Sequence, residues 1–234
     1  MPGPVALVGA SEFLPEMAEI DAELLGASRR SRPRVAILPT ASWPDGPAVF
    51  DRWAALGTVH FEELGAEVEV VPVRERADAD DPANAQAVGE ADLIYLSGGK
   101  PSHLRAALEG SAVWSAMIAA HARGSVLAGC SAGAMVLGSQ QAEFRFPPQL
   151  PLGFEPGLGL LPGIAVLPHY DRFPETLAAL RVARAPRGTV VLGIDEATAA
   201  IGQDGNWHVR GTGRVTVWRG RHRERLRAGE TFQI

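Results

Sequence analysis

Residues 126–138 read Val-Leu-Ala-Gly-Cys-Ser-Ala-Gly-Ala-Met-Val-Leu-Gly, and this stretch decides the fold of the chain. A short apolar run ends in Gly129-Cys130-Ser131-Ala132-Gly133 and continues into a helix-compatible segment. The order Gly-x-Ser-x-Gly between a strand and a helix is typical of a nucleophile elbow, a turn that pushes its central residue toward positive φ. The alternative is a small-residue turn that lets a helix pack closely on a sheet. Because the flanking strand and helix fit the elbow, we expect the Ser131 hydroxyl to act as a nucleophile at the end of a strand.

A nucleophilic serine also needs backbone donors for the oxyanion that forms during the reaction. The N–H of Ala132, next to Ser131 in the elbow, is the first candidate. Paired glycines, Gly98 and Gly99, follow the apolar run 93–96 and allow a ligand to approach the backbone closely. We therefore expect the N–H of Gly99 to be the second donor and Gly98 to border the substrate. Lys100 follows directly and could attract a carboxylate or a carbonyl group of the substrate.

Apolar runs alternate with helix-period segments through the first 200 residues. Strands are expected at 5–8, 35–38, 68–73, 93–96, 125–128, 164–167, 190–194 and 198–201, and helices at 14–27, 50–64, 102–109, 112–123 and 174–183. This order predicts an α/β fold with a mostly parallel sheet flanked by helices on both faces. Glycines punctuate the last thirty residues, which predicts β-hairpins that extend or flank the same sheet. We expect one domain over residues 1–234, with 197–234 as its C-terminal β-hairpin extension.

A serine nucleophile requires a base within hydrogen-bond reach, and six histidines are available. His169 follows the strand expected at 164–167 and precedes a helix, which places it at the carboxyl edge of the sheet together with Ser131. The other five lie in helical segments or in the hairpin tail: His60, His103, His121, His208 and His222. His169 is therefore the expected base.

The carboxylate that orients the base is less sharply defined by the sequence. Glu143 lies where the helix after the elbow is expected to end, and Glu155 lies in a segment rich in glycine and proline. Asp171 is two residues beyond His169, although a direct bond from it to the imidazole would be strained. We rank Glu143 first among these alternatives.

Composition excludes several classes of function. The 234 residues carry a net charge of −5, which gives no support for nucleic-acid or anionic-membrane binding, although seven arginines lie between 210 and 227. Cys130 is the only cysteine, so no intrachain disulfide can form. A signal peptide and a membrane-spanning apolar run are not seen, and we expect a cytoplasmic protein. Dinucleotide and Walker loops and metal-ligand spacings are missing too, so no cofactor and no metal are expected.

Several segments together resemble the dipeptidase E and cyanophycinase family of serine peptidases. The matching segments are Leu96-Ser97-Gly98-Gly99-Lys100, Gly129-Cys130-Ser131-Ala132-Gly133-Ala134, Pro156-Gly157-Leu158-Gly159-Leu160-Leu161-Pro162, Pro168-His169-Tyr170 and Gly193-Ile194-Asp195-Glu196-Ala197-Thr198-Ala199. The resemblance implies a class I glutamine-amidotransferase-like fold, with Ser131 as nucleophile, His169 as base and an acid in the loop region, matched by Glu143. It also implies hydrolysis of peptide bonds after aspartate, or of the β-aspartyl-arginine bonds of cyanophycin.

These observations lead to one main hypothesis and to alternatives. The main hypothesis is a serine hydrolase, acting as a monomer or homodimer, that cleaves small aspartyl peptides through an acyl-enzyme. Asp171 and Arg172, directly after His169, are expected to contact that substrate together with Gly98 and Lys100. One alternative is a cyanophycinase-like hydrolase of β-Asp-Arg bonds, and another is a non-catalytic protein that binds acidic peptides or metabolites at the same edge. An esterase of the α/β-hydrolase type is disfavoured by the 38 residues between Ser131 and His169 and the long chain that follows.

Overall fold

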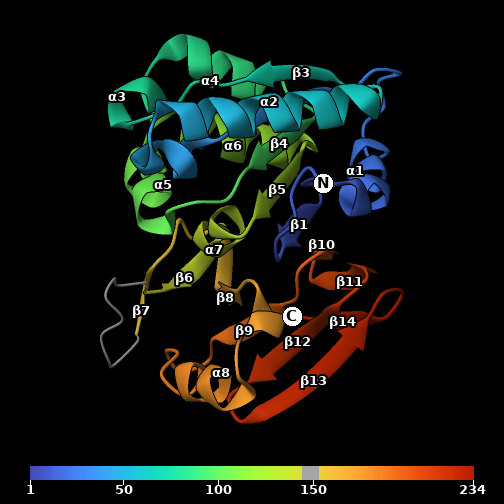
Figure 1. Ribbon diagram of the computed structural model, residues 1–234, viewed down its shortest axis with the longest axis vertical. Coiled ribbons are helices and arrows are strands. Elements are labelled where there is room, and N and C mark those ends of the chain that lie inside the picture. The colour runs from blue at the N-terminus through green and yellow to red at the C-terminus, as the bar shows by residue number, and fades with distance from the viewer. Residues whose placement is uncertain (144–152) are drawn as a thin grey trace.

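The computed structural model describes residues 1–143 and 153–234, which form two β-sheets with helices packed around them (Figure 1). An eight-stranded sheet has the order β14-β11-β10-β1-β5-β4-β2-β3. Its strands are β1 Val5–Val8, β2 Arg34–Leu38, β3 Glu67–Val70, β4 Leu93–Leu96, β5 Val126–Cys130, β10 Thr198–Gln203, β11 Asn206–Gly211 and β14 Thr231–Gln233. The first five are parallel to their neighbours, and the last three are added antiparallel beyond β1.

Alternating apolar residues let both faces of this sheet bury against helices. In β4, Leu93 and Tyr95 join one core cluster, whereas Ile94 and Leu96 join the other. The first face is covered by η1 Pro15–Met17, α1 Ala18–Leu25 and α2 Pro47–Glu63, and the second by α3 Arg76–Ala79, α4 Pro82–Gly89, α5 Pro101–Leu108, α6 Ala112–Arg123 and α7 Ala132–Leu137. In Figure 1 the parallel strands of this sheet lie between the two groups of helices in the upper half of the molecule, whereas β10, β11 and β14 lie in the lower half.

Helix ends follow from local sequence. Ser111 caps α6 by accepting a hydrogen bond from the Trp114 N–H at 3.0 Å, and Gly124 ends it in the left-handed conformation at φ 116°. Asp81 caps α4 in the same way through the Ala83 N–H at 2.9 Å, with proline in the first helical position. The end of α6 at Gly124 sets where the chain re-enters the sheet, because β5 begins two residues later.

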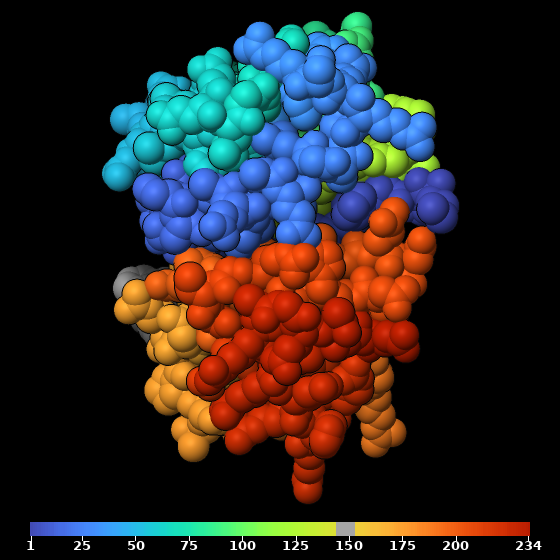
Figure 2. Space-filling view, turned by 90° about the vertical axis from the view of Figure 1, so that its right-hand side faces the viewer, coloured from blue at the N-terminus to red at the C-terminus, as the bar shows by residue number. Residues whose placement is uncertain are grey.

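The second sheet has six strands in the order β13-β12-β9-β8-β6-β7. Its strands are β6 Gly138–Ala142, β7 Phe154–Pro156, β8 Leu161–Leu167, β9 Val190–Ile194, β12 Arg214–Arg219 and β13 His222–Arg227. One face packs into the main core, and the other packs against α8 Glu175–Val182. In the space-filling view of Figure 2, the C-terminal strands form the lower half of the face.

The α/β class with a mostly parallel main sheet flanked by helices is confirmed. The expectation that all strands share one sheet is wrong, because β8 and β9 belong to the second sheet and β12 pairs with β9 rather than with β11. Two α-helices and two strands between expected elements were missed, namely α3, α4, β6 and β7, and the helix after the elbow ends earlier than expected, at Leu137. Within the described parts of the chain, none of the helices has the length and apolar character that crossing a membrane requires.

Candidate active site

The turn after β5 has the backbone of a nucleophile elbow. Ser131 sits at φ 49° and ψ −108°, a conformation that L-residues rarely adopt. A methyl group at Gly129 would lie 2.4 Å from the carbonyl carbon of Gly133, and one at Gly133 would lie 2.2 Å from the Leu96 oxygen. The small residues are therefore required for α7 to start this close to the sheet, and the strained turn holds the Ser131 hydroxyl at the strand end.

His169 comes to this serine from the other sheet. It follows β8 in the left-handed conformation, at φ 51°, and begins a short 3-10 helix, η3 Tyr170–Arg172. Its Nε2 lies 3.1 Å from Ser131 Oγ, which is hydrogen-bond distance. The sequence predicts both residues on one edge of one sheet, whereas the structure joins them across the junction of two sheets.

Glu196 occupies the far side of the imidazole. Its Oε1 lies 3.0 Å from His169 Nδ1, on the opposite side of the ring from Ser131. The residue sits in the connection 195–197, where the chain leaves β9 in the second sheet and enters β10 in the first. Since β8 and β9 are parallel with Leu167 opposite Gly193, the segments after their carboxyl ends meet at the same edge.

Two neighbours hold the Glu196 carboxylate and its backbone. Arg172 donates from Nη2 to Glu196 Oε2 at 2.7 Å, and the Glu196 N–H donates to Asp171 Oδ1 at 3.0 Å. The Arg172 hydrogen bond, followed by the one with His169, lowers the pKa of Glu196 below its usual value. Glu196 is therefore ionised at neutral pH and accepts the Nδ1–H of His169, which leaves Nε2 as the acceptor that faces Ser131.

The structure does not bring Glu143 to the histidine, and the prediction of that role is corrected. Glu143 follows β6, and its backbone carbonyl accepts a hydrogen bond from Arg181 Nη2 at 3.0 Å. Its charge faces Arg181, where it opposes the fall in the arginine pKa that burial causes. The physical reason for the error is the early end of α7: six further residues, mostly in β6, carry Glu143 away from the elbow. Glu155 is also elsewhere, accepting from Gln141 Nε2 at 2.6 Å.

Backbone donors for an oxyanion border Ser131 on both sides. The N–H of Ala132 lies in the first turn of α7, where N–H groups have no acceptor within the helix. Gly99 follows β4 at φ 141°, and its N–H meets no acceptor among the described residues. A methyl group at Gly98 would lie 3.4 Å from Ser131 Cβ, so the glycine pair passes directly beside the nucleophile.

Charged groups around the site come in pairs. Lys100 Nζ lies 3.4 Å from Asp45 Oδ1, at the end of η2 Thr40–Asp45, and its side chain is 57% exposed. Arg172 is 69% exposed although it holds Glu196. Both cations thus remain accessible to a substrate carboxylate. In residues 1–143 and 153–234, no group of three or more His, Cys, Asp and Glu side chains could hold a metal ion.

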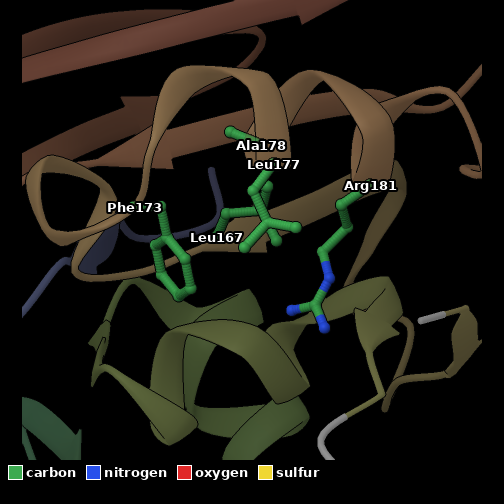
Figure 3. Close-up of a pocket in the computed structure, with 5 residues that line it drawn as sticks. All are labelled: Leu167, Phe173, Leu177, Ala178 and Arg181. Carbon is green, nitrogen blue, oxygen red and sulfur yellow. The ribbon is translucent and has the colours of Figure 1, made fainter. Parts of the chain in front are cut away.

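A small apolar cavity lies beside the loop that carries His169. It measures about 30 Å³ and is lined by Leu167, Phe173, Leu177, Ala178 and Arg181. Figure 3 shows the Phe173 ring and the Arg181 side chain reaching down from η3 and α8 toward the ribbon below them. A cavity of this size has room for about one water molecule or one methyl group, which is too little for a peptide substrate.

Three kinds of similarity to known proteins agree with this geometry. The profile of "Peptidase family S51" matches residues 5–210. A cyanophycinase of Trichormus variabilis is 29% identical over 222 residues, which cover 91% of this chain and 72% of the relative. A cyanophycinase of Synechococcus elongatus is 29% identical over 201 residues, covering 78% of this chain and 58% of the relative.

Solved structures show the same architecture. A peptidase from an acI-B1 Actinobacterium superposes with a TM-score of 0.89 at 31% identity, covering 100% of this chain and 98% of the other. A provisionally assigned peptidase E protein from Listeria monocytogenes EGD-e has a TM-score of 0.67 at 18% identity, covering 91% of this chain and 100% of the other. At that identity the second comparison supports the fold alone.

Proposed function

The chain belongs to peptidase family S51 and is a serine peptidase, and from this premise we propose that it hydrolyses small aspartyl peptides with Ser131 as nucleophile, His169 as general base and Glu196 as the acid that orients the base. The observation that carries this assignment is the continuous chain of contacts from Ser131 Oγ to His169 Nε2, and from His169 Nδ1 to Glu196, at 3.1 and 3.0 Å. A serine, a histidine and a carboxylate in this order form the catalytic triad of serine hydrolases.

In the first half-reaction, Ser131 Oγ attacks the carbonyl carbon while His169 Nε2 takes the hydroxyl proton. The carbonyl oxygen becomes negative and accepts hydrogen bonds from the N–H groups of Gly99 and Ala132, each worth about 2.7–4 kcal/mol in comparable enzymes. The ionised Glu196 stabilises the imidazolium that forms. His169 then gives its proton to the leaving amine as the C–N bond breaks, and an ester on Ser131 remains.

In the second half-reaction, water attacks this ester and His169 takes a proton from the water. The tetrahedral intermediate uses the same two N–H groups. When the C–O bond to Ser131 breaks, the proton returns from His169 to the serine oxygen and the carboxylic acid product leaves. Each proton thus passes through Nε2, and the imidazole ends in its starting state.

Two observations support an acidic substrate. Lys100 directly follows the proposed donor Gly99, Arg172 contacts Glu196, and both cations are well exposed. A carboxylate on the substrate could pair with either of them in a charge-assisted hydrogen bond. The cyanophycinase relatives, by their name, act on cyanophycin, so a β-Asp-Arg dipeptide is the second candidate substrate. Asp45 and Asp171, beside those cations, favour this candidate because they could receive an arginine side chain.

A dipeptide panel tests the substrate assignment. Release of free amino acid would be measured for α-Asp-Leu, β-Asp-Arg, Glu-Leu and Ala-Leu with the wild-type protein and with Ser131→Ala. We expect α-Asp-Leu to be cleaved with a kcat/KM at least about tenfold above that of Glu-Leu and Ala-Leu, since one buried or paired charge contributes about 1.4 kcal/mol or more to discrimination. A preference for β-Asp-Arg would instead select the cyanophycinase-like alternative.

The Ser131→Ala variant separates the mechanism from the specificity. Removal of a serine nucleophile lowers kcat by about 10⁶-fold in a comparable enzyme, so the variant should show no turnover on any dipeptide. Its circular dichroism spectrum should match that of the wild type, because alanine tolerates the elbow about as well as serine does. Wild-type turnover in Ser131→Ala would contradict the proposed mechanism whatever the substrate.

A further inference from the structure

A buried carboxylate lies directly behind the proposed oxyanion hole and takes no part in the mechanism described above. Glu12 follows β1 and is 6% exposed. Its Oε1 accepts the N–H of Gly98 at 2.8 Å, and its Oε2 accepts the S–H of Cys130 at 2.9 Å. One side chain therefore connects the loop after β4 with the elbow after β5.

On the β4 side, the contact fixes the direction of a backbone donor. The peptide before Gly98 is held by Glu12, and the peptide after Gly99 is held by the Lys100 N–H, which donates to the Ala41 oxygen at 2.7 Å. Of these three successive peptides, only the middle one has an N–H that meets no acceptor among the described residues. That N–H belongs to Gly99. The two anchors leave this peptide little freedom to rotate.

On the β5 side, the contact is one residue from the nucleophile. Cys130 is fully buried, and the next N–H, that of Ser131, donates to the Val8 oxygen at 3.0 Å. Glu12 thus holds the elbow at its base from the same carboxylate that holds Gly98. A shift of this side chain would change the separation between Gly99 N–H and Ser131 Oγ.

The loop that carries Glu12 is itself held in an uncommon conformation. Ser11 and Phe13, the residues on either side, have φ values of 70° and 64°, and neither is glycine. Phe13 is buried in an aromatic cluster, with its ring 5.1 Å from Tyr95 and 6.0 Å from Phe61. Strained backbone of this kind persists where the surroundings enforce it, and it concentrates at functional sites.

We propose that Glu12 is a positioning residue that holds the two loops of the oxyanion hole at the separation the reaction requires. The inference rests on the proposed roles of Ser131, Gly99 and Ala132. It requires the reach and the acceptor oxygen of the side chain more than its charge, because the contact that orients Gly99 is a hydrogen bond from a backbone N–H. Glutamine therefore replaces glutamate best, and aspartate, which is shorter by one methylene, replaces it poorly.

The test uses diisopropyl fluorophosphate, whose tetrahedral adduct on serine places an oxygen in the oxyanion hole. The second-order rate constant of inactivation and the labelled residue would be measured for the wild type, Glu12→Gln, Glu12→Asp and Glu12→Ala. The matched control is Glu16→Gln, an exposed glutamate four residues further along. We expect Glu12→Ala to react about 10²-fold more slowly, Glu12→Asp about tenfold more slowly, and Glu12→Gln and Glu16→Gln within about threefold of the wild type.

Turnover distinguishes positioning from a general loss of structure. On the best dipeptide, kcat should fall in parallel with the inactivation rate, while KM changes by less than about threefold, because the oxyanion contact forms in the transition state. Glu12→Asp and Glu12→Gln decide the matter if Glu12→Ala does not fold. Equal inactivation rates in all folded variants, or a slower rate in Glu12→Gln than in Glu12→Asp, would overturn the proposal. A wild-type protein that is not labelled at Ser131 would instead overturn the proposed function.

Discussion

Glu196 contacts the His169 imidazole with one oxygen and the Arg172 guanidinium with the other, and this sharing is the central electrostatic feature of the site. Oε1 faces His169 Nδ1 at 3.0 Å, and Oε2 accepts from Arg172 at 2.7 Å. The hydrogen bond from Arg172 lowers the pKa of Glu196, so the carboxylate stays ionised beside the imidazole. The ionised carboxylate can therefore stabilise the imidazolium that forms when His169 takes the Ser131 proton.

Substitution of Glu196 and of Glu143 by glutamine tests which of the two carboxylates orients His169. Glu196→Gln should lower kcat by about 10³–10⁴-fold, because the amide cannot stabilise the imidazolium or hold the required tautomer. Glu143→Gln, the matched control, should stay within about twofold of the wild type, since Glu143 lies by Arg181 rather than by the imidazole. Steady-state kinetics on the best dipeptide would measure both variants. A large loss in Glu143→Gln with none in Glu196→Gln would contradict the assignment.

At the scale of residues, the sequence alone could identify positions whose chemistry depends on local pattern. Ser131 lies in a Gly-x-Ser-x-Gly turn, and His169 comes two residues after an expected strand. Glu196 also comes two residues after an expected strand, at 190–194, so the same rule could have found it. The place of Glu143 at the expected end of the helix after the elbow favoured that residue instead, and this criterion fails where strand pairing joins residues that are distant in the chain. Glu12 carried no such signal, because its contacts with Gly98 and Cys130 join residues 86 and 118 positions away.

At the scale of elements, the segment after β8 is fixed by a contact between a ring and a glycine. The Tyr170 ring lies over Gly193 in β9, where a methyl group would come within 2.3 Å of Tyr170 Cδ2. The Tyr170 hydroxyl accepts a hydrogen bond from Trp218 Nε1 in β12 at 3.0 Å. Since Tyr170 follows His169 directly, three elements of the second sheet cooperate to place the imidazole.

Gly193→Ala tests this coupling. The added methyl group should displace Tyr170 and with it His169, which we expect to lower kcat by at least about tenfold, because a shift of 1 Å at a catalytic group can cost about 10²-fold. Overpacking should also lower the free energy of unfolding by about 1–3 kcal/mol. Urea denaturation and steady-state kinetics would measure the two effects.

Gly89→Ala is the matched control. Gly89 ends α4, and a methyl group there would have no heavy atom within 4 Å. We expect this variant to keep full activity and to gain about 0.5–1 kcal/mol of stability, as alanine does in helices. If Gly193→Ala loses stability but keeps wild-type kcat, Tyr170 does not position His169.

A helix or strand was predictable from the sequence where its own residues showed a clear hydrophobic pattern from end to end. The strands at 93–96 and 190–194 were placed with the right bounds, because their apolar runs are bounded by polar or glycine residues. β6 was missed because Gly138-Ser139-Gln140-Gln141-Ala142 has little apolar character, and its place in the sheet depends on pairing with β8 and β7. Such a strand is specified by its tertiary partners rather than by its own residues.

At the scale of the whole molecule, the two sheets meet where the site is formed. β5 of the first sheet supplies Ser131, whereas β8 and the end of β9 in the second sheet supply His169 and Glu196. The pairing of strands across such distances could not be read from periodicity, because each apolar run fits either sheet equally well. The class of fold was therefore predictable, but the division into two sheets was not.

Charge is distributed unevenly over the molecule. Residues 1–143 contain 19 acidic and 10 basic side chains, whereas residues 144–234 contain 8 acidic and 12 basic ones. Arginines of the C-terminal strands bind carboxylates of earlier elements: Arg210 contacts Glu23 in α1 at 2.6 Å, and Arg225 contacts Glu175 in α8 at 2.5 Å. These ion pairs give the tail arginines a role in attaching the last strands to the helices.

The stability of the whole fold should depend on pH through a carboxyl group buried between α1 and α2. Asp21 is 0% exposed, and its Oδ2 lies 2.8 Å from His60 Nε2, while its Oδ1 has no hydrogen-bond partner among the described residues. Burial, opposed by the contact with His60, raises the pKa of Asp21 above its ordinary value of about 3.8. Between that value and the raised one, the folded protein keeps the proton that the unfolded chain has lost.

In this window the stability of the wild type falls as pH rises, by about 1.4 kcal/mol for each unit by which the folded pKa exceeds the unfolded one. Asp21→Asn carries no titrating group at position 21. Its free energy of unfolding should therefore rise relative to that of the wild type as pH increases from about 4 to about 7. Urea denaturation of both proteins across this range measures the difference, and Asp51→Asn, at an exposed position in α2, should track the wild type throughout. A difference between Asp21→Asn and the wild type that stays constant with pH would show that the Asp21 carboxyl titrates alike in the folded and unfolded protein, contrary to its burial beside His60.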